Sequence, residues 1–384
     1  MAIRVNPGFI DVLDKFGREN IQLCYQCGDC SAVCPHADEF YKFPRKPIRQ
    51  LQMGLEKKIE TTLEPWLCYY CGDCSDLCPR NADPGATMMI LRRYLSSVYD
   101  WTGLSRKFYT SYKWELGAIT IIGLMITLLF SVFNPNGIVT SLTPEGGVKV
   151  NEMFPVETVN TGAHIMLITI AGFLISNIIR MWYFTILKDK TLKISFSSYV
   201  IQFRQLIIHF ATQVRFSKCK DKKYWGFHWI LMSGYTLMFI LIVGNLKWFQ
   251  TDKIYLWYHP QRLLGYYSTF GLLLGLVYFF YGRIKKADQI FKLSHLSDWI
   301  FIVLLLFTTV SGILLHIFRI EGLPVATYYT YIIHMAVLVP MLCVEVPFSK
   351  WSHLAYRPFA IYFSELKKSA LSIRNREKLF LKHN

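Results

Sequence analysis

The chain has 384 residues, of which 53% are apolar and 18% are charged. Soluble globular proteins average roughly 45–50% apolar and 25% charged residues, so this composition excludes a disordered chain, a disulfide-rich secreted scaffold and a wholly soluble enzyme. The formal net charge is +16, yet residues 1–108 hold 14 basic and 13 acidic residues, a net of +1. The positive excess therefore belongs to the apolar remainder. This favours cytoplasmic loops of a membrane protein over a surface that binds nucleic acid.

The first 100 residues contain an internal repeat built on eight of the ten cysteines. Each copy has the spacing C-x2-C-x2-C-x3-C-P, and the copies begin at Cys24 and Cys68. This spacing matches the run that binds [4Fe–4S] clusters in bacterial two-cluster ferredoxins, where the fourth cysteine of each run ligates the other cluster. We therefore predict two clusters, one on Cys24, Cys27, Cys30 and Cys78, and the other on Cys68, Cys71, Cys74 and Cys34.

Disulfides and zinc are the competing explanations for these cysteines. The segment before Cys24 lacks the uninterrupted apolar stretch of a secretory signal, which predicts a reducing cytoplasmic location where disulfides are rare. Structural zinc sites pair their ligands as C-x2–4-C and do not need three consecutive thiolates followed by Cys-Pro. Clusters whose corners are all held by thiolates relay electrons rather than catalyse a reaction. Outside the repeat, Cys219 and Cys343 are expected to be ordinary buried or interfacial thiols.

The rest of the chain contains six apolar runs, each close to the roughly 20 residues that cross a bilayer. We expect a mainly α-helical protein, with residues 44–60 forming one helix between the two cysteine motifs. The predicted spans lie near 116–133, 163–187, 227–249, 260–282, 297–320 and 325–348. The predicted parts are a cytoplasmic ferredoxin-like domain at 1–100, an interfacial linker at 101–115, a six-helix transmembrane domain at 116–355 and a basic cytoplasmic tail at 356–384.

The connections between the apolar runs alternate in charge. Residues 188–225 carry nine Lys and Arg against two acids, and residues 349–384 carry eight against two, whereas residues 134–163 carry one Lys and three acids. By the positive-inside rule, we expect both termini, the long loop and the cysteine domain on the cytoplasmic side of a prokaryotic inner membrane. Within that loop, residues 194–216 have apolar side chains at helical spacing. They are expected to lie in the membrane interface, with a soluble packing helix as the alternative.

Histidines at matching depths are candidate haem ligands, because ionisable side chains inside a membrane are costly and often functional. His228 opens the third run and His353 follows the sixth, both at the cytoplasmic side. His334 precedes His353 by 19 residues, about 28 Å along a helix, which places it near the outer side. These depths predict two haem b groups with two imidazoles each. The inner haem would use His228 and His353, and the outer haem His334 with His164, His259 or His316, of which His164 is favoured. The remaining histidines, expected to be interfacial or exposed, are His36, His209, His295 and His383.

Two segments resemble known families. The cysteine repeat, with Pro44-Arg45-Lys46 and Gln52-Met53-Gly54 between its copies, resembles the C subunits of heterodisulfide reductases. The stretch that starts at His334 and ends in Pro347-Phe348-Ser349-Lys350-Trp351-Ser352-His353 resembles the last haem-binding helix of respiratory nitrate reductase gamma subunits. Their fusion resembles the membrane C subunits of quinone-interacting membrane-bound oxidoreductase complexes. One position departs from the nitrate reductase pattern, because Met238 stands where a second histidine would follow His228.

This resemblance implies a di-haem cytochrome b domain, two [4Fe–4S] clusters and a menaquinone site. It also implies flavin-containing cytoplasmic partners similar to the A subunits of heterodisulfide reductases and, beyond them, adenylylsulfate reductase. The expected function is therefore electron transfer between menaquinol in the membrane and a cytoplasmic flavoprotein, within an oxidoreductase complex of sulfate respiration. Candidate outer-side groups for the quinone are Lys247, Arg262, Arg319 and Glu321. The expected partner surface surrounds Asp29, Asp73 and the second cysteine motif.

Two other functions compete with this one. The chain could be the membrane subunit of a heterodisulfide reductase-type complex that uses another lipophilic carrier, although it has no Cys-Cys-Gly motif to cleave a disulfide itself. A transporter with a cluster-based sensor domain is the third possibility. Transporters commonly show repeated spans, and the six runs show no such repeat.

Overall fold

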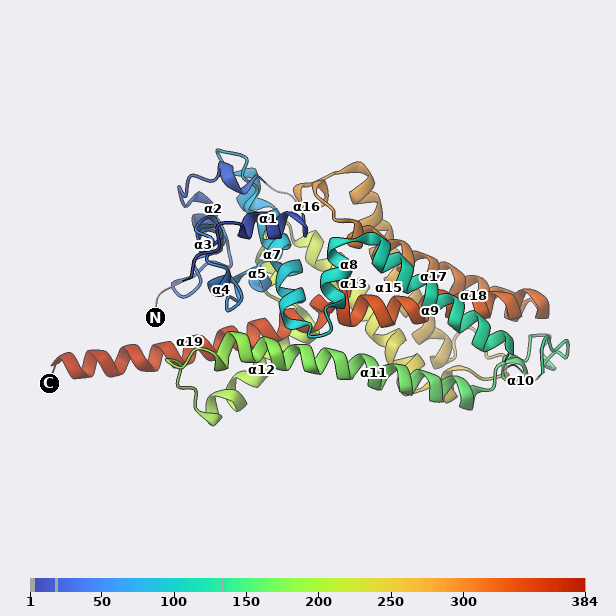
Figure 1. The fold of residues 1–384 in the computed structure, drawn as a ribbon. Coiled ribbons are helices and arrows are strands. Elements are labelled where there is room, and N and C mark those ends of the chain that lie inside the picture. Colours follow the sequence, from blue (N-terminus) through green and yellow to red (C-terminus); the bar gives the residue numbers. More distant parts are fainter. Residues whose placement is uncertain (1–3, 18–19, 133, 135, 384) are drawn as a thin grey trace.

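The computed structural model describes residues 4–17, 20–132, 134 and 136–383, with side chains described as far as Ser372. Helices account for 72% of the chain. The described residues form no strand, only an isolated antiparallel bridge between Leu142 and Val148. A small N-terminal domain lies at one end of a bundle of long helices (Figure 1). The prediction of a mainly α-helical protein is confirmed.

Short helices joined by loops build the N-terminal domain. Residues 44–60 form two helices rather than the expected one, because Gly54 has φ +63 and its backbone approaches the Asn6 carbonyl too closely for a side chain. The longest helix begins where Asp83 accepts a hydrogen bond from the Ala86 N–H at 3.0 Å. The elements are α1 (Phe9–Asp14), η1 (Ile21–Leu23), α2 (Asp29–Ala32), α3 (Arg45–Gln52), α4 (Glu56–Ile59), α5 (Glu64–Leu67), α6 (Asp73–Asp76) and α7 (Pro84–Tyr99).

Six helices among the described residues are long and apolar enough to cross a membrane, as predicted. The third ends near Gly244 rather than 249, because Asn245 interrupts it and Leu246–Phe249 form a separate helix, α14. The spans are α9 (Tyr112–Val132), α11 (Val156–Trp182) with η2 (Tyr183–Leu187), α13 (Lys222–Phe239) with η4 (Ile240–Gly244), α15 (Pro260–Lys285), α17 (Leu296–Ile320) and α18 (Pro324–Phe348).

Helix α18 lies at the centre of the bundle, where it packs against α9, α11 and α17. The outward faces of the surrounding helices leave large apolar side chains uncovered, including Ile121 at 69% exposure and Ile168 at 70%. Large exposed apolar faces are stable against lipid but not against water. The chain is therefore a multi-pass membrane protein, with its apolar bundle beside the N-terminal domain.

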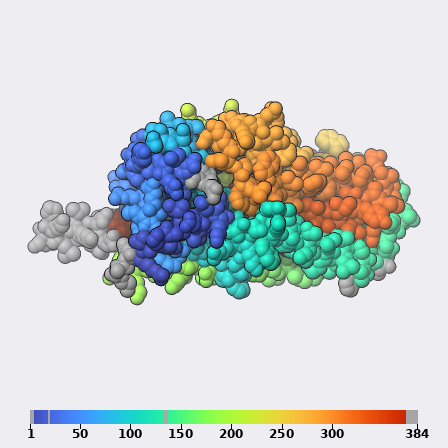
Figure 2. Space-filling model, turned by 45° about the horizontal axis from the view of Figure 1, so that its top comes forward, coloured from blue at the N-terminus to red at the C-terminus, as the bar shows by residue number. Residues whose placement is uncertain are grey.

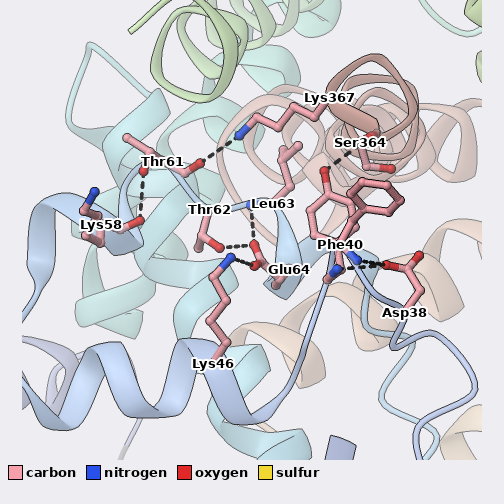
Figure 3. Close-up of polar contacts among 11 residues, drawn as sticks. Asp38, Phe40, Lys46, Lys58, Thr61, Thr62, Leu63, Glu64, Ser364 and Lys367 are labelled. Atoms are coloured by element: carbon pink, nitrogen blue, oxygen red, sulfur yellow. Dashed lines mark hydrogen bonds and ion pairs between the residues drawn. The ribbon is translucent and has the colours of Figure 1, made fainter. Parts of the chain in front are cut away.

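Residues expected as a basic tail form most of a long helix, α19 (His353–His383), which runs past the N-terminal domain (Figure 1). The ring of Tyr356 lies 4.9 Å from that of Trp66 in α5. Polar contacts continue this interface (Figure 3). The Tyr41 hydroxyl donates to the Ser364 carbonyl at 3.3 Å, and Lys367 Nζ donates to the Thr61 carbonyl at 3.4 Å. The first part of α19 thus fixes the N-terminal domain against the bundle.

The long loop between α11 and α13 contains the expected amphipathic helix, α12 (Phe196–Thr212), which packs along α19. Ser195 begins it by accepting the Ser198 N–H at 3.3 Å. Its apolar face remains uncovered, with Phe196 82% and Val200 61% exposed. Such a face suits burial at the membrane surface, whereas His209 on the opposite side is buried against the protein.

Candidate metal centres

The two cysteine motifs fold into loops with the same backbone pattern. In the first, Gln26 and Gly28 have φ +61 and +104, and at the corresponding positions of the second, Tyr70 and Gly72 have φ +57 and +94. Glycine tolerates this left-handed backbone at little cost. A Cβ on Gly72 would lie 2.6 Å from the Cβ of Gln289, so the second loop also needs glycine for its close approach to the bundle.

The eight thiols form two sets, each drawn from both motifs. The thiol of Cys30 has Cys24, Cys27 and Cys78 as electrostatic neighbours, whereas that of Cys34 has Cys68 and Cys71. Cys74 lies beside Cys68, Cys34 and Cys71, and is near Cys30 where the two sets approach each other. Each motif therefore contributes its fourth cysteine to the set of the other motif, which is the arrangement that crossed ligation of two [4Fe–4S] clusters requires.

Burial, together with the neighbouring thiols, raises the pKa of Cys30 to about 11 and that of Cys34 to about 12. Four thiols crowded in a poorly solvated place are stabilised as thiolates by a bound metal. Backbone amides point at two of the sulfurs: Tyr70 N–H donates to Cys68 Sγ at 3.3 Å, and Ala82 N–H donates to Cys78 Sγ at 3.4 Å. Within the described part of the chain, no three ligating side chains converge tightly enough for a single metal ion.

His228 on α13 and His353 at the start of α19 face each other across a pocket. Their ring centroids are 6.3 Å apart and their planes are inclined at 60°. A metal bound between the two rings would give a separation of this size. It equals two metal–nitrogen bonds of about 2.0–2.1 Å plus the distance from nitrogen to ring centroid in each imidazole. Nδ1 of His353 donates to the Lys350 carbonyl oxygen at 2.6 Å, which orients the ring and leaves Nε2 for a metal.

The walls of this pocket suit a large, flat, apolar group with acidic substituents. The side chains around the two imidazoles are mostly apolar or aromatic, and Arg357 supplies a positive charge. Nδ1 of His228 is buried and has no hydrogen-bond partner among the described residues. The residues present therefore fit a haem. The apolar and aromatic part of the lining includes Leu231, Met232, Tyr235, Leu305, Trp351 and Ile361.

Tyr69 belongs both to this pocket and to the second cysteine motif. It follows Cys68 directly in the chain, and its side chain lines the same pocket as His228 and His353. Its ring stacks on Phe216 at 5.0 Å, and the ring of Phe216 lies 5.8 Å from that of His228. A continuous set of aromatic rings therefore connects the histidine pocket with the thiols of the second motif.

The other histidines proposed as ligands lie apart from this pocket. His334 on α18 is held by Ser311, whose Oγ lies 2.9 Å from its Nδ1. His164 is exposed on α11, and its Nδ1 donates to the Asn160 carbonyl at 2.7 Å. His259 caps α15 through the Gln261 N–H. The contacts given by the described residues bring none of the three alternatives against His334.

The third alternative, His316, takes part in a polar group at the end of the bundle that was expected to be the outer one. Its Nε2 lies 2.8 Å from Arg262 Nη1 and 3.3 Å from the Tyr266 hydroxyl. Arg319 instead donates to backbone carbonyls of the loop after α14. Lys247 forms an exposed ion pair with Glu157 at 2.9 Å. Of the candidate quinone groups, Arg262 is thus the one joined to a histidine.

Two histidines near the metal centres are buried, although the sequence suggested that they are interfacial or exposed. His209 lines the pocket beside His228 and His353, and His36 is only 4% exposed. The Cys219 sulfur lies 3.5 Å from His36 Nε2 and is also a neighbour of Cys71. The sequence gives no signal for the burial of His209, because this residue lies on the side of α12 opposite the exposed Phe196 and Val200. The side chain of His383 lies outside the described residues.

The comparisons with known proteins concern the N-terminal part. Residues 20–82 match the 4Fe-4S dicluster domain. This part of the chain is an iron–sulfur electron-transfer domain. A protein of Archaeoglobus profundus, described as similar to the C subunit of heterodisulfide reductase, is 31% identical over 90 residues, which cover 23% of this chain and 48% of that protein. The iron–sulfur C subunit of the CoB–CoM heterodisulfide reductase of Methanopyrus kandleri is 34% identical over 71 residues, covering 16% and 37%.

The chain therefore spans about half, or less, of the curated relatives that it matches. No solved structure matches the chain. The relation to the C subunits of heterodisulfide reductases supports an oxidoreductase component that carries iron–sulfur clusters. The matched stretches of 90 and 71 residues are too short to include the six membrane helices.

Proposed function

We propose that this protein is a membrane electron-transfer subunit, which passes electrons between a quinol and a cytoplasmic flavoprotein through haem b and two [4Fe–4S] clusters. The position of Tyr69 is the observation that carries the proposal. Its side chain lines the pocket of His228 and His353, while its backbone follows Cys68. One residue thus spans the boundary between the membrane centre and the cysteine domain.

The cofactors would be held as follows. A haem b in the inner pocket would be ligated by His228 and His353, and would supply one-electron redox chemistry there. Arg357 would pair with its acidic substituents, and the apolar walls would exclude water. A second haem would use His334, with Ser311 holding its Nδ1, and His164 as fourth imidazole would have to turn inward from its exposed position. Cys24, Cys27, Cys30 and Cys78 would hold one cluster, and Cys68, Cys71, Cys74 and Cys34 the other.

The two thiol sets differ in their surroundings, which supports an order for the relay. Gly72 in the second motif meets Gln289 of α16 (Gln289–Lys292), and the N-terminal domain abuts this part of the bundle (Figure 2). In the first motif, Cys27 is exposed and Tyr25 is 71% exposed. The second set would therefore exchange electrons with the inner haem. The first set would face the partner, which keeps Asp29 of the expected surface but not Asp73 and the second motif.

Within this function, we assign the chain to the membrane C subunits of quinone-interacting membrane-bound oxidoreductase complexes. Menaquinol would donate at the outer side, near Arg262 and His316, and flavin-containing subunits would connect the first cluster with adenylylsulfate reductase. Both termini would lie on the cytoplasmic side of a prokaryotic inner membrane. The matched relatives favour one alternative, a heterodisulfide reductase-type complex that uses another lipophilic carrier.

The test is anaerobic purification of the full chain in detergent, followed by addition of a menaquinol analogue. Appearance of the absorbance bands of reduced haem b would support both the haem and the menaquinol donor. Reduction by a different lipophilic carrier, with no response to menaquinol, would favour the alternative complex. A preparation with iron and acid-labile sulfide but no haem would overturn the proposal.

A further inference from the structure

Two buried carboxyl groups lie at the cytoplasmic end of the bundle, away from the residues assigned above. Glu115 of α9 and Glu345 of α18 are both 0% exposed. Glu115 accepts hydrogen bonds from the hydroxyls of Ser297, at 2.9 Å, and Ser349. Glu345 Oε2 accepts the Lys350 N–H at 3.2 Å. These donors hold both carboxyl groups in fixed positions between three chain segments.

The two carboxyl groups lie within hydrogen-bond reach of each other. Oε1 of Glu345 is buried and has no donor among the described residues. Two carboxylates in contact in a poorly solvated place cannot both stay ionised, because the repulsion is unscreened and each charge has lost its hydration. The ammonium of Lys350, whose backbone N–H contacts Glu345, is already paired with Asp298. One proton between the carboxyl groups satisfies the orphan oxygen and removes the repulsion.

We propose that Glu115 and Glu345 form a proton-binding site that holds one shared proton and takes up a second from the cytoplasm when the inner haem pocket is reduced. The backbone of Lys350 links the two places. Its N–H donates to Glu345 and its carbonyl accepts from Nδ1 of His353. This part of the inference rests on the proposed function, since the electron would come from the quinol.

The step balances in charge. One electron enters the pocket of His228 and His353, and one proton from cytoplasmic water turns the half-protonated pair into two carboxylic acids. Tyr109 neighbours both carboxyl groups, and its ring packs 6.3 Å from that of the half-buried His295 at the start of α17. The proton would enter from this side. The ionisable groups next to the two glutamates are Tyr109, Asp298 and Lys350. Further ionisable groups surround Asp298, namely Arg93, Arg283 and His295.

Infrared spectroscopy of the purified full chain tests both parts. A carboxylic-acid C=O band that shifts in D2O is expected at pH 7 in the oxidised protein. Glu115→Gln and Glu345→Gln should each abolish that band, because the glutamine amide replaces the shared proton as donor and leaves the other residue ionised. Glu157→Gln, at an exposed position, is the matched control and should leave the band unchanged.

The outcomes separate the site from the proposed function. Absence of the band from the unmodified protein, or its persistence in both glutamine variants, would overturn the shared proton whether or not haem is bound. With haem present, the reduced-minus-oxidised spectrum should gain carboxylic-acid intensity that both variants lose. A difference spectrum without this gain would overturn the redox-linked uptake. A chain without haem that still shows the band would support the proton site and contradict the electron-transfer proposal instead.

Discussion

The guanidinium carbon of Arg357 lies 4.2 Å from the centroid of the Tyr69 ring. This cation–π contact joins the second cysteine motif to α19, one turn beyond His353, and it holds the phenol ring in the pocket wall. Tyr25 stands at the corresponding position of the first motif, but it lies outside the pocket and is largely exposed. The repeat therefore supplies its own matched control for the role of Tyr69.

The first prediction concerns electron transfer across this boundary. Tyr69→Leu removes the ring between the pocket and the thiols of the second motif, so electron transfer from reduced haem to the clusters should become slower. Tyr25→Leu should leave the rate unchanged. Stopped-flow reduction with a quinol analogue, followed at haem and cluster wavelengths, measures this rate. Equal rates in the parent and both variants would show that Tyr69 has no part in the path.

The second prediction tests the crossed arrangement of the thiols. Cys78→Ser should lower the iron content by about four of eight atoms. The electron paramagnetic resonance spectrum of the remaining cluster should match that of Cys27→Ser, although Cys78 belongs to the other motif. Cys71→Ser should leave the opposite cluster, and Cys343→Ser in α18 should retain both. A Cys78→Ser spectrum that matches Cys71→Ser would contradict crossed ligation.

The third prediction identifies the haem ligands. His353→Ala and His334→Ala should each remove about half of the haem b, because each would disable one of two bis-histidine sites. His209→Ala changes a histidine that lines the same pocket as His353, yet it should retain the full haem content. Pyridine haemochrome analysis measures these amounts. If His209→Ala loses as much haem as His353→Ala, His209 is the ligand instead.

The fourth prediction concerns a buried carboxylate inside the N-terminal domain. Burial would raise the pKa of Glu64, but the Lys46 ammonium at 2.6 Å and the Thr62 hydroxyl hold it below its usual value. Lys46→Met should therefore destabilise the protein by about 1–3 kcal/mol at pH 7, since it leaves a buried carboxylate short of a donor. Lys42→Met, at an exposed position of the same segment, should have little effect.

The pH dependence of this destabilisation follows from the direction of the pKa shift. A carboxyl group with a lowered pKa stabilises the fold above its unfolded pKa, about 4.3, and loses this contribution as the pH falls further. In Lys46→Met the pKa of Glu64 should be higher than in the parent, because burial is no longer opposed by the ammonium. The loss of stability should thus be largest towards pH 8 and should shrink as the pH falls to about 4 and below. Thermal unfolding in detergent measures it. A difference that grows towards low pH would contradict the assigned charge on Glu64.

Helix number and the cysteine repeat could be read from the sequence because each depends on a local pattern. Runs of apolar residues gave the six spans, and only the third ends earlier, at the break before α14. The spacing within the motifs predicted which cysteines share a cluster. In the structure Cys78 is a neighbour of Cys30, and Cys34 is a neighbour of Cys68 and Cys71, while the ligation itself stays a prediction. Gly54, by contrast, divides an expected helix because its neighbour Asn6 comes from a distant part of the chain.

The contacts between distant segments could not be predicted. The basic composition of residues 356–384 suggested a free tail, yet Tyr356 and Ser364 are buried against the N-terminal domain. His209 lies on the polar side of an amphipathic helix, and whether such a side faces solvent or protein depends on the partner helix, here α19. The assignment of His164 to an outer haem stays a prediction, and its exposed position gives no partner for His334.

The unequal burial of the two motifs also indicates which of the two thiol sets dioxygen should damage first. Oxidants dissolved in water reach Cys27 directly, whereas Cys68 and Cys74 are buried. Damage by dioxygen should therefore begin at the iron held by the first motif and spare the set beside the membrane pocket. A protein damaged in this way would still accept electrons from the membrane but could no longer pass them to a partner. After brief aeration, its remaining redox centres would stay reduced and the chain would stay folded.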